Sequence, residues 1–291
     1  MYLKYLQRYN AKVYNKYIVS CTVLLVQQIL KWNDNMILAL DIGNTNIVLG
    51  CVNKHKKVSS LFRIKTDISR TSWQYAVEIN SMLDIYNIDK SSLDGCIIAS
   101  VVPPLTSVMK KAVNLAAGLE PMVVGPGIKT GLNIAIDNPA QTGSDRVADA
   151  VAVIDQYKVP AISIDMGTAT TVSVIDANKT YIGGMIIPGI MISQEALASR
   201  TSQLPKISLE PPKRVIGSNT IEGMKSGAVY GSAAMIDGVL QRIEEELGQK
   251  ATVIATGGLA PSIIPHCKRK DIIVDTNLLL KGLRILYDKN K

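Results

Sequence analysis

The chain has 291 residues, of which 47% are hydrophobic and 19% are charged, and its formal net charge is +8. This length and composition favour a soluble protein with two cores of ordinary size. The cysteines are scattered with no close pair, which excludes a disulfide framework and a zinc spacing and suits a reducing compartment. They are Cys21, Cys51, Cys96 and Cys267.

The first 35 residues differ in character from the rest of the chain. Five basic residues against Asp34 alone (five minus one) give this stretch +4, half of the whole net charge. Tyr17 to Leu30 resembles a signal segment, but it is too short to span a bilayer and no small-residue cleavage site follows it. Because Met36 opens the first predicted strand, we expect natural translation to start there and residues 1–35 to lie outside the fold. A helix on a membrane surface is the alternative.

Two stretches of the chain look like copies of one sequence motif, Leu40 to Asn46 and Ile164 to Thr170. Each places an Asp at the end of an apolar strand, then a Gly, then small hydroxyl or amide residues. The Gly lets the backbone approach an anion, and the residues after it offer donors. One copy would be weak evidence, because such turns are ordinary structure. The duplication predicts a nucleotide held between two related lobes.

Each copy continues into the same succession of strands, which predicts a β-meander in each lobe. The second strands are expected at 47–52 and 171–175, and the third at 57–64 and 180–187. Apolar periodicity and capping residues predict helices at 72–86, 105–117, 144–157, 189–199, 217–247 and 277–287. Further strands are expected at 96–102, 123–124 and 252–255. This order indicates an α/β protein with mixed sheets, divided into lobes 36–142 and 143–291.

A polar loop and a helix start, Asn138 to Arg146, lie between the two copies. Ser144 is predicted to be the N-cap, with Asp145 and Arg146 in the first turn. An acidic residue there complements the helix dipole, which is a purely structural explanation. A cation there is disfavoured, so we expect Arg146 to face an anion such as Asp145, a phosphate or a substrate carboxylate. The residues alone leave structural and functional interpretations equally open.

Two further loops carry weaker signals. The paired glycines Gly257 and Gly258 follow a predicted strand and could pack flat against a ligand such as an adenine ring, but such pairs are common in turns. The segment Gly217 to Thr220 precedes a long helix, so its polar residues are either a capping cluster or part of the cleft.

In combination, these motifs resemble the sugar-kinase, actin and heat-shock ATPase superfamily, and within it the type III pantothenate kinases. The similar segments are 41–46, 100–104, 125–127, 130–131, 137–139, 143–146, 165–171, 183–184, 188–189, 219–220 and 257–258. The resemblance implies two duplicated RNase H-like (actin-like ATPase) domains with mixed sheets and a nucleotide cleft between them. It also implies ATP-dependent phosphorylation of pantothenate to 4'-phosphopantothenate, the first step of coenzyme A biosynthesis. The enzyme would be a cytoplasmic homodimer that needs Mg²⁺ and a monovalent cation, K⁺ or NH₄⁺.

The resemblance further implies a role for each matching residue. Asp145 would be the catalytic base, Asp165 would bind the monovalent cation, and Asp41 would bind Mg²⁺ through ATP. ATP would contact Asp41, Ile42, Gly43, Asn44, Thr45, Asn46, Ile47, Val48 and Thr168. Pantothenate would contact Ile136, Gly143, Ser144, Asp145, Arg146 and Thr220. Three acids at a polyanion site would repel it without cations, so charge favours the same metal requirement.

The sequence departs from the family at Ile136, where a Tyr usually lines the substrate pocket. Two other functions stay open: a kinase of the same superfamily with another small hydroxylated substrate, and a non-catalytic regulator acting on nucleic acid. The segment Asp137 to Arg146 argues against the first. Half of the charge lies in residues 1–35, and no helix-turn-helix or basic-aromatic stripe is evident, so we expect neither nucleic acid nor membrane as a partner.

Overall fold

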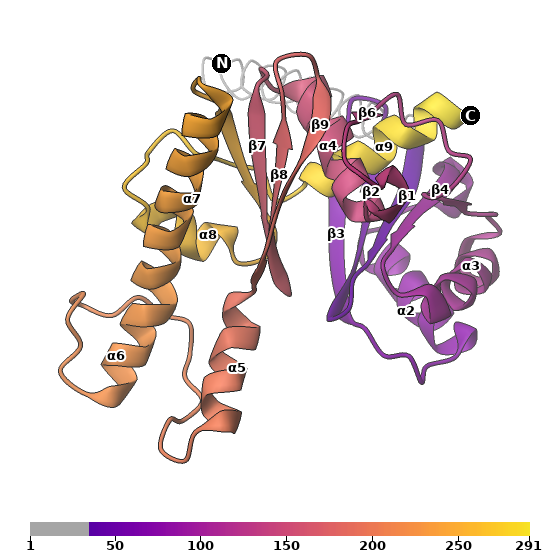
Figure 1. The fold of residues 1–291 in the computed structure, drawn as a ribbon. Coiled ribbons are helices and arrows are strands. Elements are labelled where there is room, and N and C mark those ends of the chain that lie inside the picture. Colours follow the sequence, from indigo (N-terminus) through magenta and orange to yellow (C-terminus); the bar gives the residue numbers. More distant parts are fainter. Residues whose placement is uncertain (1–34) are drawn as a thin grey trace, which may run out of the picture.

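Two mixed β-sheets form the framework of the molecule (Figure 1). The structure, a computed structural model, describes residues 35–291, so the predictions for the N-terminal extension lie outside the described residues. The first sheet has the order β3-β2-β1-β4-β5 and the second β11-β10-β7-β8-β9-β6. The first comprises β1 (Met36–Ile42), β2 (Asn46–Val52), β3 (Val58–Lys65), β4 (Leu93–Ser100) and β5 (Met122–Val123). The second comprises β6 (Asn133–Ile134), β7 (Ala161–Met166), β8 (Ala169–Ile175), β9 (Thr180–Pro188), β10 (Thr252–Thr256) and β11 (Ile273–Val274).

The two sheets share one plan. In each, three consecutive strands pair antiparallel, β1-β2-β3 and β7-β8-β9, and a later strand pairs parallel with the first of the three. The predicted meanders and mixed sheets are therefore confirmed. The two-residue strands β6 and β11 were not predicted, because so short a segment has no periodicity to detect.

Helices cover the outer face of each sheet (Figure 1). α2 (Ser72–Ile85) and α3 (Pro103–Ala117) pack on the first sheet, and α3 ends at Gly118, whose φ of 69° is left-handed. α7 (Ser232–Leu247) and α8 (Ala260–Ile263) pack on the second. α5 (Ile190–Arg200) continues from β9 away from the sheets.

The helix predicted over 217–247 is wrong in its start, whereas its continuity from Thr220 to Leu247 is confirmed. α6 (Thr220–Ser226) begins only after Asn219, whose side chain accepts a hydrogen bond from Glu222 N at 3.0 Å. A π-helical stretch that was not predicted, η3 (Gly227–Gly231), joins α6 to α7 without interrupting the helical backbone. Periodicity detects neither feature, because a cap and a π-helix depend on local backbone hydrogen bonds.

Two helices, α4 (Ser144–Gln156) and α9 (Leu278–Asn290), lie between the sheets (Figure 1). α9 packs on β1, β2 and β4, and α4 contacts α9, β4, β7 and β8. The helices approach so closely that a Cβ at Gly282 would collide with the Ala148 carbonyl. The division of the chain at residue 143 stays a prediction, since β6 joins the second sheet and α9 returns to the first. No described helix combines the length and apolar character that a membrane crossing requires.

Candidate active site

A cavity of about 430 Å³ lies between the two sheets and is lined by both Asp-Gly loops. One loop connects β1 to β2 and the other connects β7 to β8. Their tips touch, because Thr45 Oγ1 and Thr168 Oγ1 lie 2.8 Å apart in a hydrogen bond. The two copies of the motif therefore face each other across one cleft.

Three carboxylates converge on this cavity: Asp41 from β1, Asp165 from β7 and Asp145 from the first turn of α4. All three are half-buried. Burial, with the charges of Asp145 and Asp165 added, raises the pKa of Asp41 to about 8. Burial and the charge of Asp145 raise the pKa of Asp165 to about 6. The cleft is thus a place where negative charge is costly until a cation enters.

The start of α4 is fixed by hydrogen bonds that aim Asp145 at the cleft. The predicted N-cap is wrong: Gly143 is the N-cap, and Ser144 is the first helical residue. The Ser144 hydroxyl instead accepts from Ser100 N at 3.0 Å and donates to Ser100 O at 3.2 Å, which ties α4 to the end of β4. Asp145 Oδ1 accepts from Arg146 N at 2.8 Å. A Cβ at Gly143 would collide with that same Oδ1, so the carboxylate position depends on glycine.

The Arg146 side chain contacts an aromatic ring and not Asp145, which is one of the three anions expected to face it. Its guanidinium donates to the Tyr181 hydroxyl, and its central carbon lies 5.6 Å from the Tyr181 ring centroid. Arg146 Nε is buried without a hydrogen-bond partner among the described residues. Tyr181 on β9 therefore holds Arg146 beside Asp145.

The structure brings together only part of the residue set that the resemblance implies. Asp41, Gly43, Asn44, Thr45, Asn46, Val48, Asp145, Asp165 and Thr168 line the cavity. Ile42 and Ile47 are fully buried in the core of the first lobe. Ile136 is partly buried outside the cavity lining, 3.7 Å from the Cβ position of Gly183.

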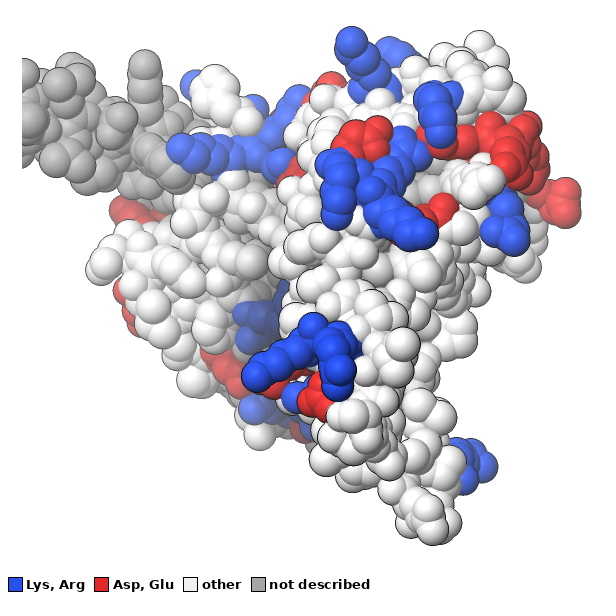
Figure 2. All heavy atoms as spheres, turned by 90° about the vertical axis from the view of Figure 1, so that its left-hand side faces the viewer, with Lys and Arg blue, Asp and Glu red and all other residues white. Residues whose placement is uncertain are grey.

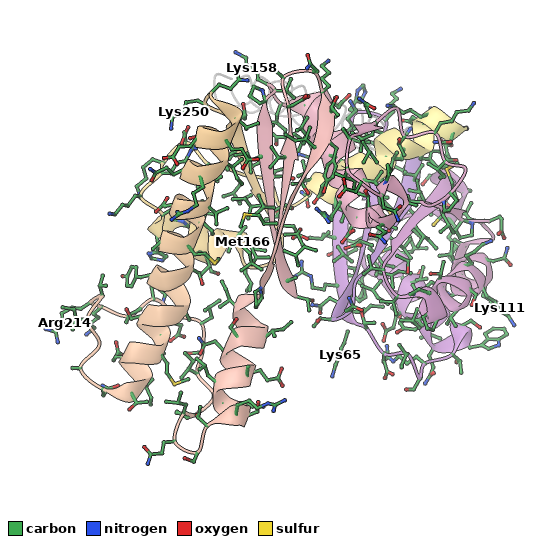
Figure 3. All side chains as sticks on the ribbon, viewed as in Figure 1. Lys65, Lys111, Lys158, Met166, Arg214 and Lys250 are labelled. Atoms are coloured by element: carbon green, nitrogen blue, oxygen red, sulfur yellow. The ribbon has the colours of Figure 1, made fainter. Side chains whose placement is uncertain are left out.

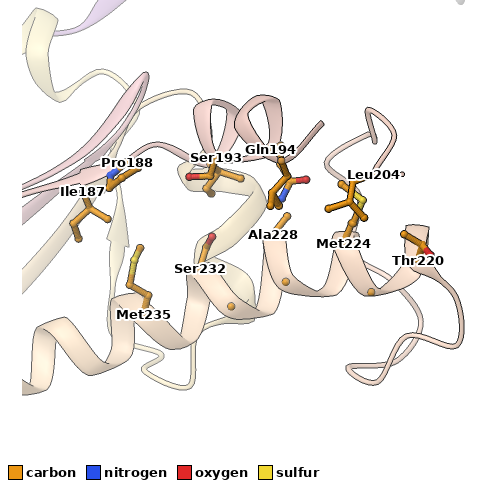
Figure 4. A pocket seen from close by; sticks show the side chains of 15 residues that line it. Ile187, Pro188, Ser193, Gln194, Leu204, Thr220, Met224, Ala228, Ser232 and Met235 are labelled. Carbon is orange, nitrogen blue, oxygen red and sulfur yellow. The ribbon is translucent and has the colours of Figure 1, made fainter. Parts of the chain in front are cut away.

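Thr220 lies in a different place from the other predicted substrate contacts. It stands at one end of a separate groove of about 650 Å³ between α5 and the α6–η3–α7 run. Figure 4 shows Pro188 at the opposite end of this groove, with Ser193 and Gln194 facing Ala228 and Ser232 across it. Within one chain, the structure does not bring Thr220 to Asp145.

Three charged residues in or beside the site were missed in the sequence: Arg63, Asp149 and Glu195. Arg63 on β3 lines the cavity, and the strand register that places it opposite Val48 is not readable from a single strand. Asp149 lies one helical turn after Asp145 and is only 4% exposed. Burial, and then the charges of Asp165 and Asp145, raise the pKa of Asp149 well above its usual range. The i, i+4 spacing from Asp145 was the available signal.

The residues of the cleft fit a magnesium ion that arrives with a nucleotide. No three of the His, Cys, Asp and Glu side chains between 35 and 291 group closely enough to hold a metal by themselves. Mg²⁺ is commonly held by one or two carboxylates, completed by phosphate oxygens and water. Asp41, with a loop for phosphates beside it, supplies that kind of donor set.

Comparison with known proteins agrees with this geometry. The family model described as type III pantothenate kinase matches residues 37–242. A type III pantothenate kinase of Exiguobacterium sp. (strain ATCC BAA-1283 / AT1b) is 46% identical over 88% of this chain and 100% of its own length. That of Halalkalibacterium halodurans is 45% identical over 88% of this chain and 100% of its own length.

A solved structure shows the fold independently of that sequence similarity. It is the activator of 2-hydroxyisocaproyl-CoA dehydratase from Clostridium difficile with bound ADPNP. Its TM-score is 0.50 at 15% identity, and the match covers 87% of this chain and 93% of that chain. The expected actin-like ATPase fold, with two RNase H-like lobes, is confirmed.

The raised carboxyl pKa values predict how stability depends on pH. Asp41 and Asp165 titrate at about 8 and about 6 in the folded protein, above their value of 3.8 when unperturbed. The folded protein thus binds more protons than the unfolded chain at intermediate pH, so the free energy of unfolding should fall as pH rises from about 4 to about 8. Each unit of difference corresponds to roughly 1.4 kcal/mol.

Urea denaturation at several pH values, without nucleotide or metal, measures this slope. Asp41→Asn should flatten it, whereas Asp84→Asn, which changes an exposed carboxylate on α2, should not. A free energy of unfolding that rises over this range would contradict the prediction.

Proposed function

The chain belongs to the type III pantothenate kinase family, and from this premise we propose that it phosphorylates pantothenate with ATP in the cleft between its lobes. The product, 4'-phosphopantothenate, is the first intermediate of coenzyme A biosynthesis. The observation that carries the proposal is the convergence of Asp41, Asp145 and Asp165 on a cavity lined by both Asp-Gly loops. Phosphoryl transfer needs these parts: phosphate donors, a metal-holding carboxylate and a base beside the acceptor.

In the proposed mechanism, Asp145 accepts the proton of the primary hydroxyl of pantothenate. The hydroxyl oxygen forms a bond to the γ-phosphorus of ATP, the bond from that phosphorus to the β–γ bridging oxygen breaks, and ADP leaves. The hydrogen bonds between Ser144 and Ser100 fix the start of α4, and the absence of a side chain at Gly143 leaves room for the Asp145 carboxylate. Both support the role of Asp145 as the base.

The loops and α4 divide the binding of the two substrates. Backbone and side-chain donors of Gly43, Asn44, Thr45 and Thr168 would hold the phosphates of ATP, and Asp41 would hold Mg²⁺. Bound Mg²⁺ neutralises charge on the phosphates. Arg146, held by Tyr181, would contact pantothenate, and Gly143, Ser144, Ile136 and Thr220 stay proposed contacts of the same substrate.

We also propose that Asp165 binds a monovalent cation, K⁺ or NH₄⁺. The support is a half-buried carboxylate in the cavity wall whose ionised form is costly without a positive neighbour. The cytoplasm is the proposed compartment, which suits the free, buried thiols of Cys51, Cys96 and Cys267.

A homodimer is proposed from the apolar surface of the second lobe. Its lower end is nearly free of charged side chains in Figure 2. Large apolar side chains are exposed along β9, α5, the loop before α6 and the first turn of α6: Ile186, Met191, Ile192, Leu197, Val215, Ile216 and Ile221. Several large exposed apolar side chains on one part of a protein are typical of a protein–protein interface.

The role of Asp145 is tested by a coupled kinase assay with pantothenate and ATP. Asp145→Asn should lower kcat by about a hundredfold to ten-thousandfold, because the base is lost, while ATP binding persists. Asp155→Asn is the matched control, since it removes a surface carboxylate from the same helix. An unchanged kcat in Asp145→Asn would reject Asp145 as the base. Turnover of another alcohol but not of pantothenate would reject the substrate.

Replacing K⁺ with choline should lower kcat/KM by roughly tenfold, the effect of losing one charge-assisted contact. Asp165→Asn should be equally slow in both salts, because its cation ligand is gone. If Asp165→Asn keeps the full response to K⁺, the cation binds elsewhere.

Light scattering of the purified protein tests the dimer. Wild type should have twice the mass of one chain, and Ile216→Glu should shift it toward the monomer. Ile216 is 84% exposed, so a charge there should not disturb the fold of one chain. A mass unchanged by this substitution would exclude the surface around Ile216 as the interface.

A further inference from the structure

We propose that Arg63 binds the β- and γ-phosphates of ATP, reaching them from the wall of the first sheet. This inference rests on the proposed function, because it assigns a residue to the ATP site. It adds a cation to a site for which the sequence motifs supplied only acids, amides and hydroxyls.

The strand register places Arg63 in the wall of the cleft. Asp41 on β1 is opposite Val48 on β2, and Val48 is opposite Arg63 on β3. Residues directly opposite in antiparallel strands share one face of the sheet. Asp41, Val48 and Arg63 therefore form one row on the same face, and all three line the cavity.

Arg63 also reaches the opposite lobe. A Cβ at Gly258, in the loop after β10, would lie 2.7 Å from Arg63 Nη1 and 3.5 Å from the guanidinium carbon. The missing side chain at Gly258 leaves the space that the guanidinium uses. Arg63 thus extends across the cleft, between the two lobes that would enclose a nucleotide.

The charged residues of the cavity explain why a cation is placed in its wall. Arg63 is the sole Lys or Arg among the described lining residues, whereas Asp41, Asp145, Asp165 and Glu195 line the same cavity. Burial raises the pKa of Asp41 and of Asp165, and the charge of Arg63 opposes this.

The Arg63 guanidinium makes no hydrogen bond and no ion pair with the residues from 35 to 291, so its donors are available. A planar guanidinium binds phosphate oxygens in a two-point arrangement that a lysine cannot reproduce.

The duplicated lobe shows that the fold itself needs no cation in this position. In the second sheet Asp165 is opposite Thr171, and Thr171 is opposite Ile186. Ile186 therefore occupies the place of Arg63, and it is 70% exposed. A strand in this position therefore accepts an apolar residue. We attribute the cation in the first lobe to ligand binding and not to a need of the fold.

A nucleotide series tests the proposal, with affinity measured calorimetrically in Mg²⁺ for AMP, ADP and a non-hydrolysable ATP analogue. Arg63→Gln should weaken binding of ADP and of the analogue by about ten- to a hundredfold, the effect of losing charge-assisted hydrogen bonds. Binding of AMP should not change. Arg63→Lys should recover part of the loss, because it restores the positive charge but not the two-point hydrogen bonding of a guanidinium.

Lys111→Gln is the matched control for lost charge. Lys111 lies on α3, on the side of the first lobe away from the cleft (Figure 3). This variant should bind all three nucleotides as wild type does. Arg63→Gln should still unfold in one cooperative thermal transition, as wild type does, because the exposed guanidinium makes no hydrogen bond or ion pair with the described residues. A loss of affinity in this variant is then not a loss of the fold.

Two results with Arg63→Gln would overturn the proposal. Equal weakening of AMP, ADP and the analogue would mean that Arg63 acts on the base, the ribose or the fold. Unchanged affinity for all three would mean that it contacts no phosphate. A wild type that binds nucleotides but does not phosphorylate pantothenate would reject the substrate and leave this test intact. A wild type that binds no nucleotide would reject the proposed function and this proposal together.

Discussion

The contact between α4 and α9 governs the rest of the molecule, because it sets both sheets relative to the carboxylate of Asp145. The two helices meet with the Gly282 backbone against the Ala148 carbonyl, a distance that any side chain would increase. α9 packs on the first sheet, and α4 packs on strands of both. A close-packed interior transmits such a displacement rather than absorbing it. The position of Asp145 relative to the Asp-Gly loops is therefore a property of the whole core.

The same core holds negative charge where it is unfavourable. Asp41, Asp145 and Asp165 line one cavity, and Asp149 lies buried one turn further along α4. Burial destabilises the ionised carboxylates, and each ionised neighbour adds to the effect. Positive charge nearby offsets this cost, so the cleft favours ligands that bring cations with them. Arg63 supplies part of this neutralisation at the side of the cleft where the first and second lobes approach.

The sequence predicted the features that repeat or that persist over many residues. The two Asp-Gly motifs and the meanders follow from long apolar strands and a duplicated pattern, and the actin-like fold was implied by the family resemblance of those motifs. Features that depend on partners distant in the sequence were not predictable. Ser144 bonds to Ser100 instead of capping its own helix, and Arg63 enters the site only through the pairing of three strands. Thr220 matches a motif, yet it lies on another groove, because a motif does not specify which chain surface it faces.

The hydrogen bond between Thr45 and Thr168 has a consequence for how the cleft is loaded. It joins the tips of the two loops, and its hydroxyl groups are of the kind that would face phosphate oxygens. A phosphate between the tips must first break this bond, which is worth about 1 kcal/mol. The hydrogen bond between the two hydroxyls therefore competes with the phosphates for the same donors. A nucleotide whose phosphates lay between the tips would exchange the hydrogen bond of Thr45 and Thr168 for contacts of its own.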